Sequence, residues 1–598
     1  MKRTIKYILM GLIIGTIASC SDFLQTDSNS TFTTKTTFTN LDFATKNVNG
    51  IYNQFATNYM YDFVLMFTKA DNDIEQFYST SDDGSTMNLA HYSATPGTTY
   101  LKEIWNTFYQ SIEMANIAIE NLPKSPIWTN EYSDQAHQLY GAAVTLRAMN
   151  YYELMILWGD VPFKTKPTQA SDNFNIPKTD RDSIYEFLIK DLANIEQYVP
   201  WMTETKTAEH VNKGFTKGLR SRMALSYAGF SLRNKTFVTR RGRYWKDYYK
   251  IANQECKEII ESGKHKLNPS FINIFKTLHS YSQDLTYNED MFEIAFGRQN
   301  SGRLGFSFGM QFSVTPPDPK YGRATGQMRV PFSYFYTFDN KDGRREVSAE
   351  LYSYNDPTNL SKQTIPLAYS MSPTKWRRSW ITPSMGGDLK NVNYTGVNFP
   401  IMRYSDILLM YAETENEINN GPTAAAKEAL TQVRQRAFSS EFWSSKVNFY
   451  VDSVSNSKSE FFYAIVNERG WEFGGEMLRK QDLIRWNMLG TKIAEMKEEC
   501  RKIVYNERKD VPTYIFWKYK ADGETLDILN PDYKIAATQV DGYKSTYEWG
   551  WMTESVYFKA VMGQIAHGYD PVRNNHIYPI ATEIINTSNG VLSNDQIP

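Results

Sequence analysis

The 598-residue chain has few cysteines, few histidines and almost no excess charge, and each scarcity excludes a class of protein. Its 3 cysteines are too few for a disulfide framework. A formal net charge of −1 provides no strongly basic face of the kind that nucleic-acid binding requires. The 7 histidines show no metal-ligand spacing, and the chain contains no H-E-x-x-H, Walker or paired-cysteine motif. Composition therefore points to a large globular protein without a recognisable metal or nucleotide site.

Long apolar runs are also absent, and the one short run lies at the N-terminus. The stretch Tyr7–Ile17 carries no charge but is well short of the roughly 20 residues that cross a bilayer. A basic start precedes it, and Ile17-Ala18-Ser19-Cys20 follows it with the small residues and cysteine of a lipobox. We expect a lipoprotein signal peptide over 1–19 and lipidation of Cys20, with an ordinary signal peptide and a chance cysteine as the alternative.

Helical periodicity dominates two parts of the chain, about 41–263 and 402–490. The predicted helices cover residues 103–121, 133–158, 180–199, 216–232, 245–261, 404–420, 423–438, 460–473 and 477–489. Helix starts near 180, 214 and 246 are about 33 residues apart, as in tetratricopeptide repeats, although the full consensus is absent. The pattern predicts a mostly α fold in which helix pairs stack.

The remaining segments are poor in periodicity. Residues 20–40 are rich in Ser, Thr and Asn and predict a lipidated tether. Residues 264–401 are rich in Gly, Pro, Tyr and Arg, which predicts a large loop-rich region with few short strands and a functional role. The tail 505–598 is again irregular and aromatic. Cys256 and Cys500 belong to or follow helices, so we expect two buried thiols, with a single bridge left open.

Four motifs follow one another in an order that resembles the RagB/SusD family of glycan-binding lipoproteins. They are LRAMNYYEL with WGDVPF (146–163), MRYSDILLMYAE (402–413), NER with DLIRW (467–486) and HIYPI (576–580). Ala581 stands where the family usually has a second proline. The charged motif residues accompany apolar helix stripes, where charges must be paired, so we expect structural roles for them. This group comprises Arg147, Asp160, Glu413, Asp482 and Arg485.

The resemblance implies a single SusD-like domain over 41–598, mostly α, with tetratricopeptide-like helix pairs. It also implies a function: a lipid-anchored protein of the outer membrane, expected at the cell surface, that captures oligosaccharide and delivers it to a SusC-like TonB-dependent transporter. No catalytic residue and no cofactor are expected from it.

Ligand residues do not transfer by motif, so we choose them from composition in two loop regions. Aromatic rings with polar edges suit sugar rings, and short acids and amides suit hydroxyl groups. The first set lies in the loops before residue 103: Asp71, Asn72, Asp73, Tyr78, His91, Tyr92 and Tyr100. The second set lies in the loop-rich region: Arg298, Tyr321, Arg329, Tyr334, Trp376 and Trp380.

The sequence also allows functions other than glycan binding to be considered. A glycoside hydrolase needs only two carboxylates, which the 71–83 loop can supply. A helical-repeat adhesin would bind protein through its helices. The G-x-S-x-G pattern at 305–309 is rejected as a nucleophile elbow, because prolines follow where a helix is needed. The 71–76 loop resembles a calcium loop, but Gln76 replaces the glycine of an EF-hand, so a structural calcium stays an open alternative.

Overall fold

The computed structural model describes residues 34–77, 82–354, 356–366, 370–381, 393–535, 540–546, 562–563 and 565–595. The predicted signal peptide 1–19, Cys20 and Tyr78 lie outside these residues. Within the described part of the chain, no helix combines the length and apolar character needed to cross a membrane. The predicted tether is described only from Thr34, where the short helix α2 (Thr34–Thr37) leads to the buried Phe38.

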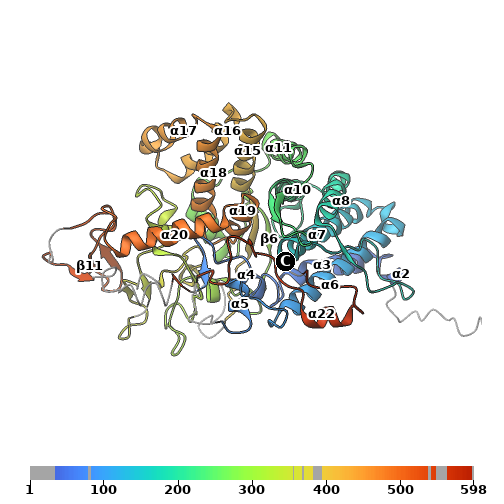
Figure 1. Ribbon diagram of the computed structural model, residues 1–598, viewed down its shortest axis with the longest axis horizontal. Coiled ribbons are helices and arrows are strands. Elements are labelled where there is room, and N and C mark those ends of the chain that lie inside the picture. Colours follow the sequence, from blue (N-terminus) through green and yellow to red (C-terminus); the bar gives the residue numbers. More distant parts are fainter. Residues whose placement is uncertain are drawn as a thin grey trace, which may run out of the picture.

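Helices form most of the described structure, and neighbours in sequence pack as neighbours in space (Figure 1). The N-terminal helices are α3 (Leu41–Phe55), α4 (Val64–Phe67), α5 (Thr86–Ala90), α6 (Leu101–Asn121), α7 (Ser133–Trp158), α8 (Arg181–Ile195), α9 (Met202–Thr205), α10 (Lys213–Ala228), α11 (Trp245–Ser262) and α12 (Phe271–His279). After the loop-rich region come α13 (Phe332–Phe335), α14 (Arg345–Ser348), α15 (Tyr404–Ile418), α16 (Ala424–Ala437), α17 (Phe449–Ser453), α18 (Lys458–Phe473), α19 (Arg479–Arg485), α20 (Leu489–Val504) and α22 (Thr582–Thr587).

The helix starts expected from the 33-residue spacing are confirmed at Arg181, Lys213 and Trp245, the first residues of α8, α10 and α11. Helix ends follow local chemistry. The side chain of Asn212 caps α10 by accepting from the amide of Phe215 (3.1 Å). Gly159 ends α7 at φ 71°, a conformation that a glycine adopts without steric cost.

Several helices were not expected, and some expected helices end early. Both α12 and nearly all of α20 lie outside the two parts of the chain predicted to be helical, although α20 buries Ile493, Met496, Cys500 and Ile503 at helical spacing. The helix predicted over 216–232 stops at Ala228, because the chain turns at Gly229 into strand β4 (Phe230–Leu232). The helix α20 extends from the helical body toward the strand β11, as Figure 1 shows.

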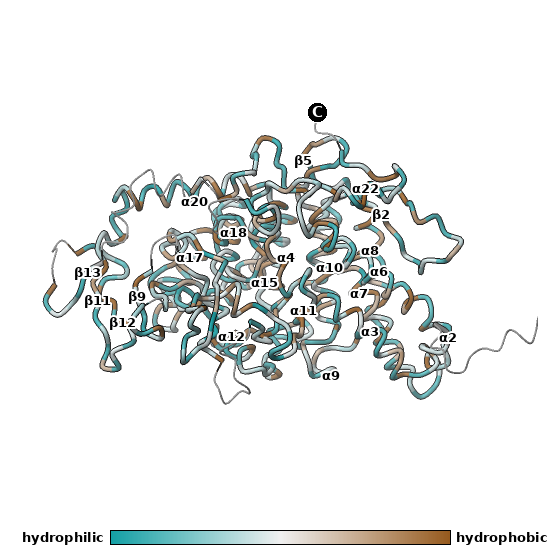
Figure 2. The backbone as a smooth tube through the Cα atoms, turned by 90° about the horizontal axis from the view of Figure 1, so that it is seen from below, coloured by the Kyte–Doolittle hydropathy of each residue, from teal (hydrophilic) through white to brown (hydrophobic). Residues whose placement is uncertain are grey.

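The strands are short and antiparallel. They are β1 (Gln76–Phe77), β2 (Val161–Pro162), β3 (Lys178–Thr179), β5 (Thr239–Arg241), β6 (Asp290–Ile294), β7 (Met328–Arg329), β8 (Ser353–Tyr354), β9 (Gln363–Thr364), β10 (Phe399–Arg403), β11 (Ile515–Tyr519), β12 (Leu526–Ile528) and β13 (Lys544–Thr546). The pair β6–β10 is fully buried and joins the loop-rich region to α15. The sheet β12–β11–β13 organises part of the tail that was expected to be irregular, and lies at the opposite end of the long axis from α2 (Figure 2).

Two hydrophobic cores hold the described structure together. The main core runs beneath the helices from α3 to α18 and includes the paired strands β6 and β10. The second core lies between α13, α19 and α20 and includes Phe332, Leu483 and Ile515. Cys256 belongs to the first core and Cys500 to the second, and both are free thiols, which confirms the expectation of two separate buried cysteines.

Candidate functional site

A cavity of about 330 Å³ lies between α18 and α20, and we call it the α18–α20 groove. Its lining comes from Asp73, Ile74, Ser333, Tyr334, Tyr336, Thr337, Asn467, Gly470, Trp471, Arg479, Lys492, Glu495, Met496, Glu499 and Arg508. The groove therefore brings together the two loop regions chosen from composition, one near residue 73 and the other at 333–337. Its size and its mixed aromatic and polar lining are typical of ligand sites.

One face of α18 supplies the wall of the groove. The helix buries Phe461, Ala464, Ile465 and Glu468, whereas Tyr463 and Asn467 are exposed and Trp471 is half-buried. Asn467 and Trp471 are four residues apart on that other face, about 6 Å along the axis. Tyr463, one further step back, is 51% exposed. Together they form a stripe of two aromatic rings and an amide on the outside of α18.

Trp471 and Tyr336 are half-buried in the lining of the groove, and neighbouring protein groups hold both rings in place. The indole N–H of Trp471 donates to the hydroxyl of Thr337 (3.1 Å), and its ring lies 6.4 Å from that of Phe338. The Tyr336 ring meets Phe335 edge-on at 5.1 Å. Burial raises the pKa of Tyr336. Rings held in this way offer an apolar surface at little entropic cost, next to polar groups.

The charged groups of the groove are arranged in pairs. Arg479 donates to both carboxylate oxygens of Asp73 at 2.8 and 2.6 Å. Burial opposes the charge of Arg479, but the Asp73 carboxylate outweighs it and raises the pKa of the guanidinium. On α20, Nζ of Lys492 lies 2.7 Å from the carboxylate of Glu495. Nη1 of Arg508, which follows the helix, lies 2.8 Å from the carboxylate of Glu499 on α20. These pairs fix the groove walls and leave the lining close to neutral.

Of the residues predicted from sequence, Asp73 and Tyr334 line the groove. Tyr334 is only 2% exposed, and its hydroxyl donates to the carbonyl of Gly470 (2.8 Å), so it forms the floor beside α18. Trp471, Tyr336 and Asn467 were not predicted. For Asn467 and Trp471, the signal that could have found them is the stripe of α18, where Tyr463, Asn467 and Trp471 follow one another at a spacing of four outside the apolar face.

Three predicted residues of the first set are buried and bond to other protein groups. Asp71, Asn72 and His91 are fully buried. Asp71 accepts from the amides of Phe77 (3.0 Å) and Ala566 (2.9 Å) and pairs with Nδ1 of His91 (2.6 Å). The prediction that these three contact ligand is wrong in this structure, because their polar atoms face inward and tie distant segments together.

The two tyrosines of this set also lie away from the groove. Tyr92 is buried, and its hydroxyl donates to the carbonyl of Asp71 (2.9 Å), so it too is corrected to a structural role. Tyr100 is half-buried at the start of α6 with its ring 6.0 Å from that of Tyr59. Its contact with a ligand stays a prediction.

A carboxylate pair for glycoside hydrolysis requires one acid with a raised pKa. Burial favours the neutral form of Asp71, but His91 and the two amides lower its pKa overall. Hydrogen bonds from the amides of Ser85 and Met87 outweigh burial and lower the pKa of Asp83. Asp73 is held by Arg479. Burial raises the pKa of Glu75 in the same loop to about 6, but its carboxylate is buried and accepts from the amides of Gly475 and Met477. The oxygens of Asp71, Asp73 and Asp83 all accept from protein donors, so these three acids form no open set of calcium ligands.

The second predicted set is divided between core and surface. Trp376 is 0% exposed, its indole N–H donates to the carbonyl of Gly475 (2.6 Å), and its ring meets Phe275 at 90°. As a ligand contact it is wrong, because long-range packing has placed the ring in the main core. Trp380 is half-buried against His279 and Arg377, and remains a prediction.

Three members of this set stay near the surface outside the groove. Arg298 is exposed, with its guanidinium 4.0 Å above the ring of Tyr281, and lines a separate cavity of about 190 Å³. Tyr321 is half-buried in an aromatic cluster and lies 5.3 Å from Phe312. Arg329 donates to Gln311 (3.0 Å) and Ser372 (3.2 Å). Their roles in ligand binding stay predictions.

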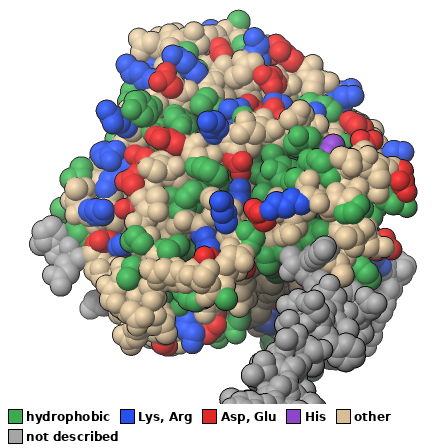
Figure 3. Space-filling model, turned by 90° about the vertical axis from the view of Figure 1, so that its right-hand side faces the viewer, with side chains coloured by type: hydrophobic (Ala, Val, Ile, Leu, Met, Phe, Trp, Pro, Cys, Tyr) green, Lys and Arg blue, Asp and Glu red, His purple; other side chains and the backbone are tan. Residues whose placement is uncertain are grey.

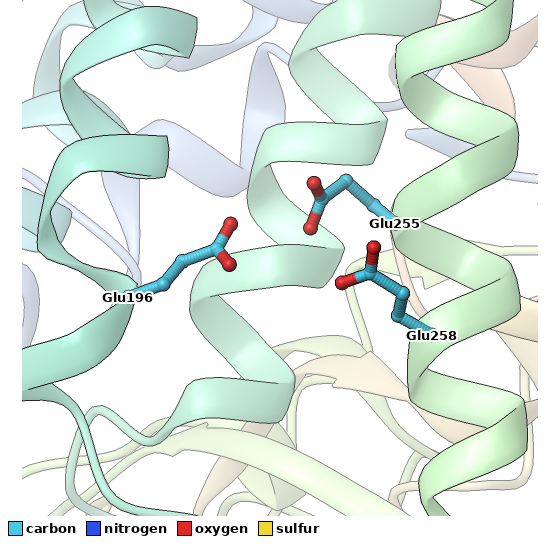
Figure 4. A group of neighbouring side chains, drawn as sticks. All are labelled: Glu196, Glu255 and Glu258. Carbon is cyan, nitrogen blue, oxygen red and sulfur yellow. The ribbon is translucent and has the colours of Figure 1, made fainter.

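Charged residues of the sequence motifs form buried ion pairs, as expected. Arg485 contacts Glu413 and Asp482, and Arg147 contacts Asp191 at 2.6 Å. A further acidic cluster joins Glu196 to Glu255 and Glu258 of α11 (Figure 4). Nζ of Lys217 lies 2.5, 3.1 and 2.7 Å from these three carboxylates, so an internal lysine supplies the charge that a metal ion would bring.

Two related family models match separate parts of the chain. Residues 350–596 match the family described as "SusD family", and residues 22–225 match "Starch-binding associating with outer membrane". SusD-like protein P25 of Formosa agariphila is 23% identical over 507 residues, covering 81% of this chain and 90% of that protein. SusD-like protein P38 of the same organism is 24% identical, covering 70% and 78%.

Solved structures agree at the level of the fold. A SusD homolog from Bacteroides thetaiotaomicron superposes with a TM-score of 0.73 at 20% identity, covering 94% of this chain and 98% of that one. Surface glycan-binding protein A of Bacteroides thetaiotaomicron, solved in complex with laminarihexaose, has a TM-score of 0.61 at 17% identity, covering 93% and 99%. The predicted mostly α architecture with few short strands is confirmed.

Proposed function

This chain belongs to the SusD/RagB family, and we propose that it captures an oligosaccharide in the α18–α20 groove at the cell surface without cleaving it. The bound glycan is then delivered to a SusC-like TonB-dependent transporter in the outer membrane. The lipid on Cys20 would hold the protein there, because acyl chains give a stable anchor when more than one is attached.

The observation that carries the proposal is the pair of half-buried rings, Trp471 and Tyr336, in one polar groove. A sugar ring has apolar C–H faces bordered by hydroxyl groups, and aromatic rings with adjacent hydrogen-bonding groups match both features. The exposed amide of Asn467 provides donors and an acceptor near the indole, and the exposed Thr337 hydroxyl, which donates its proton to the carbonyl of Tyr334, provides an acceptor. The fold of a protein that binds laminarihexaose supports the same conclusion.

The end of the molecule near α2 and α8 carries charges of both signs. On this face, shown in Figure 3, Lys and Arg side chains are interspersed with Asp and Glu side chains, and hydrophobic side chains lie between them. This face therefore provides no single-sign field for steering a polyanion. Delivery to a transporter also suits binding of modest affinity, since shallow sites must displace ordered water to gain a few contacts.

The test compares two tryptophans by calorimetric titration with a panel of oligosaccharides. Trp471→Ala removes the groove ring and should weaken binding about tenfold or more. Trp443→Ala is the matched control, because Trp443 is 38% exposed and its indole also donates a hydrogen bond (2.9 Å, to Phe438) but lines no part of the groove. Equal affinity of the two variants would contradict the proposal, and new reducing ends during incubation would show a hydrolase instead.

A further inference from the structure

We propose that the α18–α20 groove selects neutral glycans and discriminates against glycans that carry carboxylate or sulfate groups. This inference rests on the proposed function, because it specifies the ligand class of the same groove. Anionic sugars are recognised by cationic side chains that turn free N–H donors toward the ligand, commonly in bidentate pairs. The question is therefore whether the cations of the groove are available.

Three cations line the groove, and each is already engaged by a carboxylate. Arg479 is held most firmly: Nε and Nη2 donate to Asp73 at 2.8 and 2.6 Å, and Nη1 donates to the carbonyl of Val466 at 2.6 Å. Its side chain is almost fully buried. Turning this guanidinium toward a ligand would leave the Asp73 carboxylate without its partner in a buried setting, which is costly.

The two cations near α20 are also paired with carboxylates, at more exposed positions. Lys492 is 2.7 Å from Glu495. Arg508 contacts two acids, Glu499 at 2.8 Å and Asp510 at 2.5 Å, and Glu499 is also 2.7 Å from Lys502. Hydrogen bonds to Asp510 and Glu499 raise the pKa of Arg508 despite partial burial. The guanidinium of Arg508 is therefore paired with two carboxylates in the absence of a ligand.

The anions of the lining add a barrier. Asp73, Glu495 and Glu499 equal the cations in number, and Glu495 is exposed. A carboxylate or sulfate entering the groove would lose part of its hydration and approach these acids, and like charges in a partly desolvated site repel strongly. Neutral hydroxyl groups meet no such cost and can pair with the amide of Asn467 and the hydroxyl of Thr337.

The test uses matched glycan pairs that differ only in charge: a neutral oligosaccharide, its C6-oxidised uronate form and its sulfated form. Calorimetric titration at 20 and 500 mM NaCl gives affinity and salt dependence for each. We expect the neutral member to bind about tenfold or more tightly than either anion, with little change across the salt range. Glu495→Gln and Glu499→Gln should improve binding of the anionic forms and so reduce the affinity ratio between the neutral and the anionic members.

The outcomes separate this inference from the function on which it rests. Anionic members that bind as tightly as the neutral one, lose affinity in Trp471→Ala and weaken in high salt would overturn the neutral preference while supporting glycan capture in the groove. If none of the three glycans binds, or if Trp471→Ala binds them with wild-type affinity, the proposed function and this inference are both refuted. An Arg508→Gln variant that abolishes anion binding would identify the cation responsible for the contrary result.

Discussion

Replacing Trp376 with alanine should destabilise the protein severely and leave the ligand groove unchanged. The side chain is fully buried, and its ring centroid lies 5.7 Å from Phe275 and 5.8 Å from Phe399. Truncating a tryptophan in a packed core costs about 3–5 kcal/mol, since a cavity remains that the surroundings fill only in part. The loss includes about 1 kcal/mol for the hydrogen bond to the carbonyl of Gly475.

The assay is thermal unfolding followed by circular dichroism, with midpoints compared instead of free energies because the protein is too large to be assumed two-state. Trp376→Ala should lower the midpoint by several degrees, whereas Trp380→Ala, at a half-buried ring, should lower it much less. A Trp376→Ala variant that keeps the wild-type midpoint and loses glycan affinity would refute the reasoning, because it would place the indole in the ligand site.

Three further predictions follow from single side chains. Glu413→Gln removes the main partner of Arg485 and should cost about 3–5 kcal/mol, seen as a lower thermal midpoint, with wild-type stability as the contrary result. Burial lowers the pKa of His279 to about 4, so the unfolded chain takes up the proton first and stability should fall as pH drops from about 6.5 to 4. His279→Gln should reduce that fall by up to about 3 kcal/mol, and identical pH profiles for both proteins would contradict this. Tyr463→Ala removes the outermost ring of the α18 stripe and should weaken binding of long oligosaccharides more than short ones; an equal effect on all lengths would argue against an extended site.

Local periodicity predicted much of the helical structure, because an apolar stripe is visible in a single segment. The starts of α8, α10 and α11 follow from it within a residue or so. The helix α20 also has such a stripe, but its many charges make the stripe less evident, and residues 491–504 belong to none of the regions predicted from the sequence. Because α20 was not predicted, one wall of the groove could not be predicted either.

The site was harder to predict because burial depends on contacts between distant segments. Asp71 is buried through the amide of Ala566, and Trp376 through the carbonyl of Gly475, and neither partner is suggested by the local sequence. The residue composition of a loop is the same whether its acids and aromatic rings contact a sugar or pack in the protein interior. Trp471 was hidden for the opposite reason, since it belongs to a helix and was counted with the scaffold.

The most direct measurement is a crystal structure of the protein soaked with a neutral oligosaccharide that it binds in solution. The account predicts a sugar ring stacked on the indole of Trp471, with hydroxyl groups bonded to Asn467 or Thr337. A glycan located instead in the cavity beside Arg298 and Tyr281, with the α18–α20 groove empty, would contradict it.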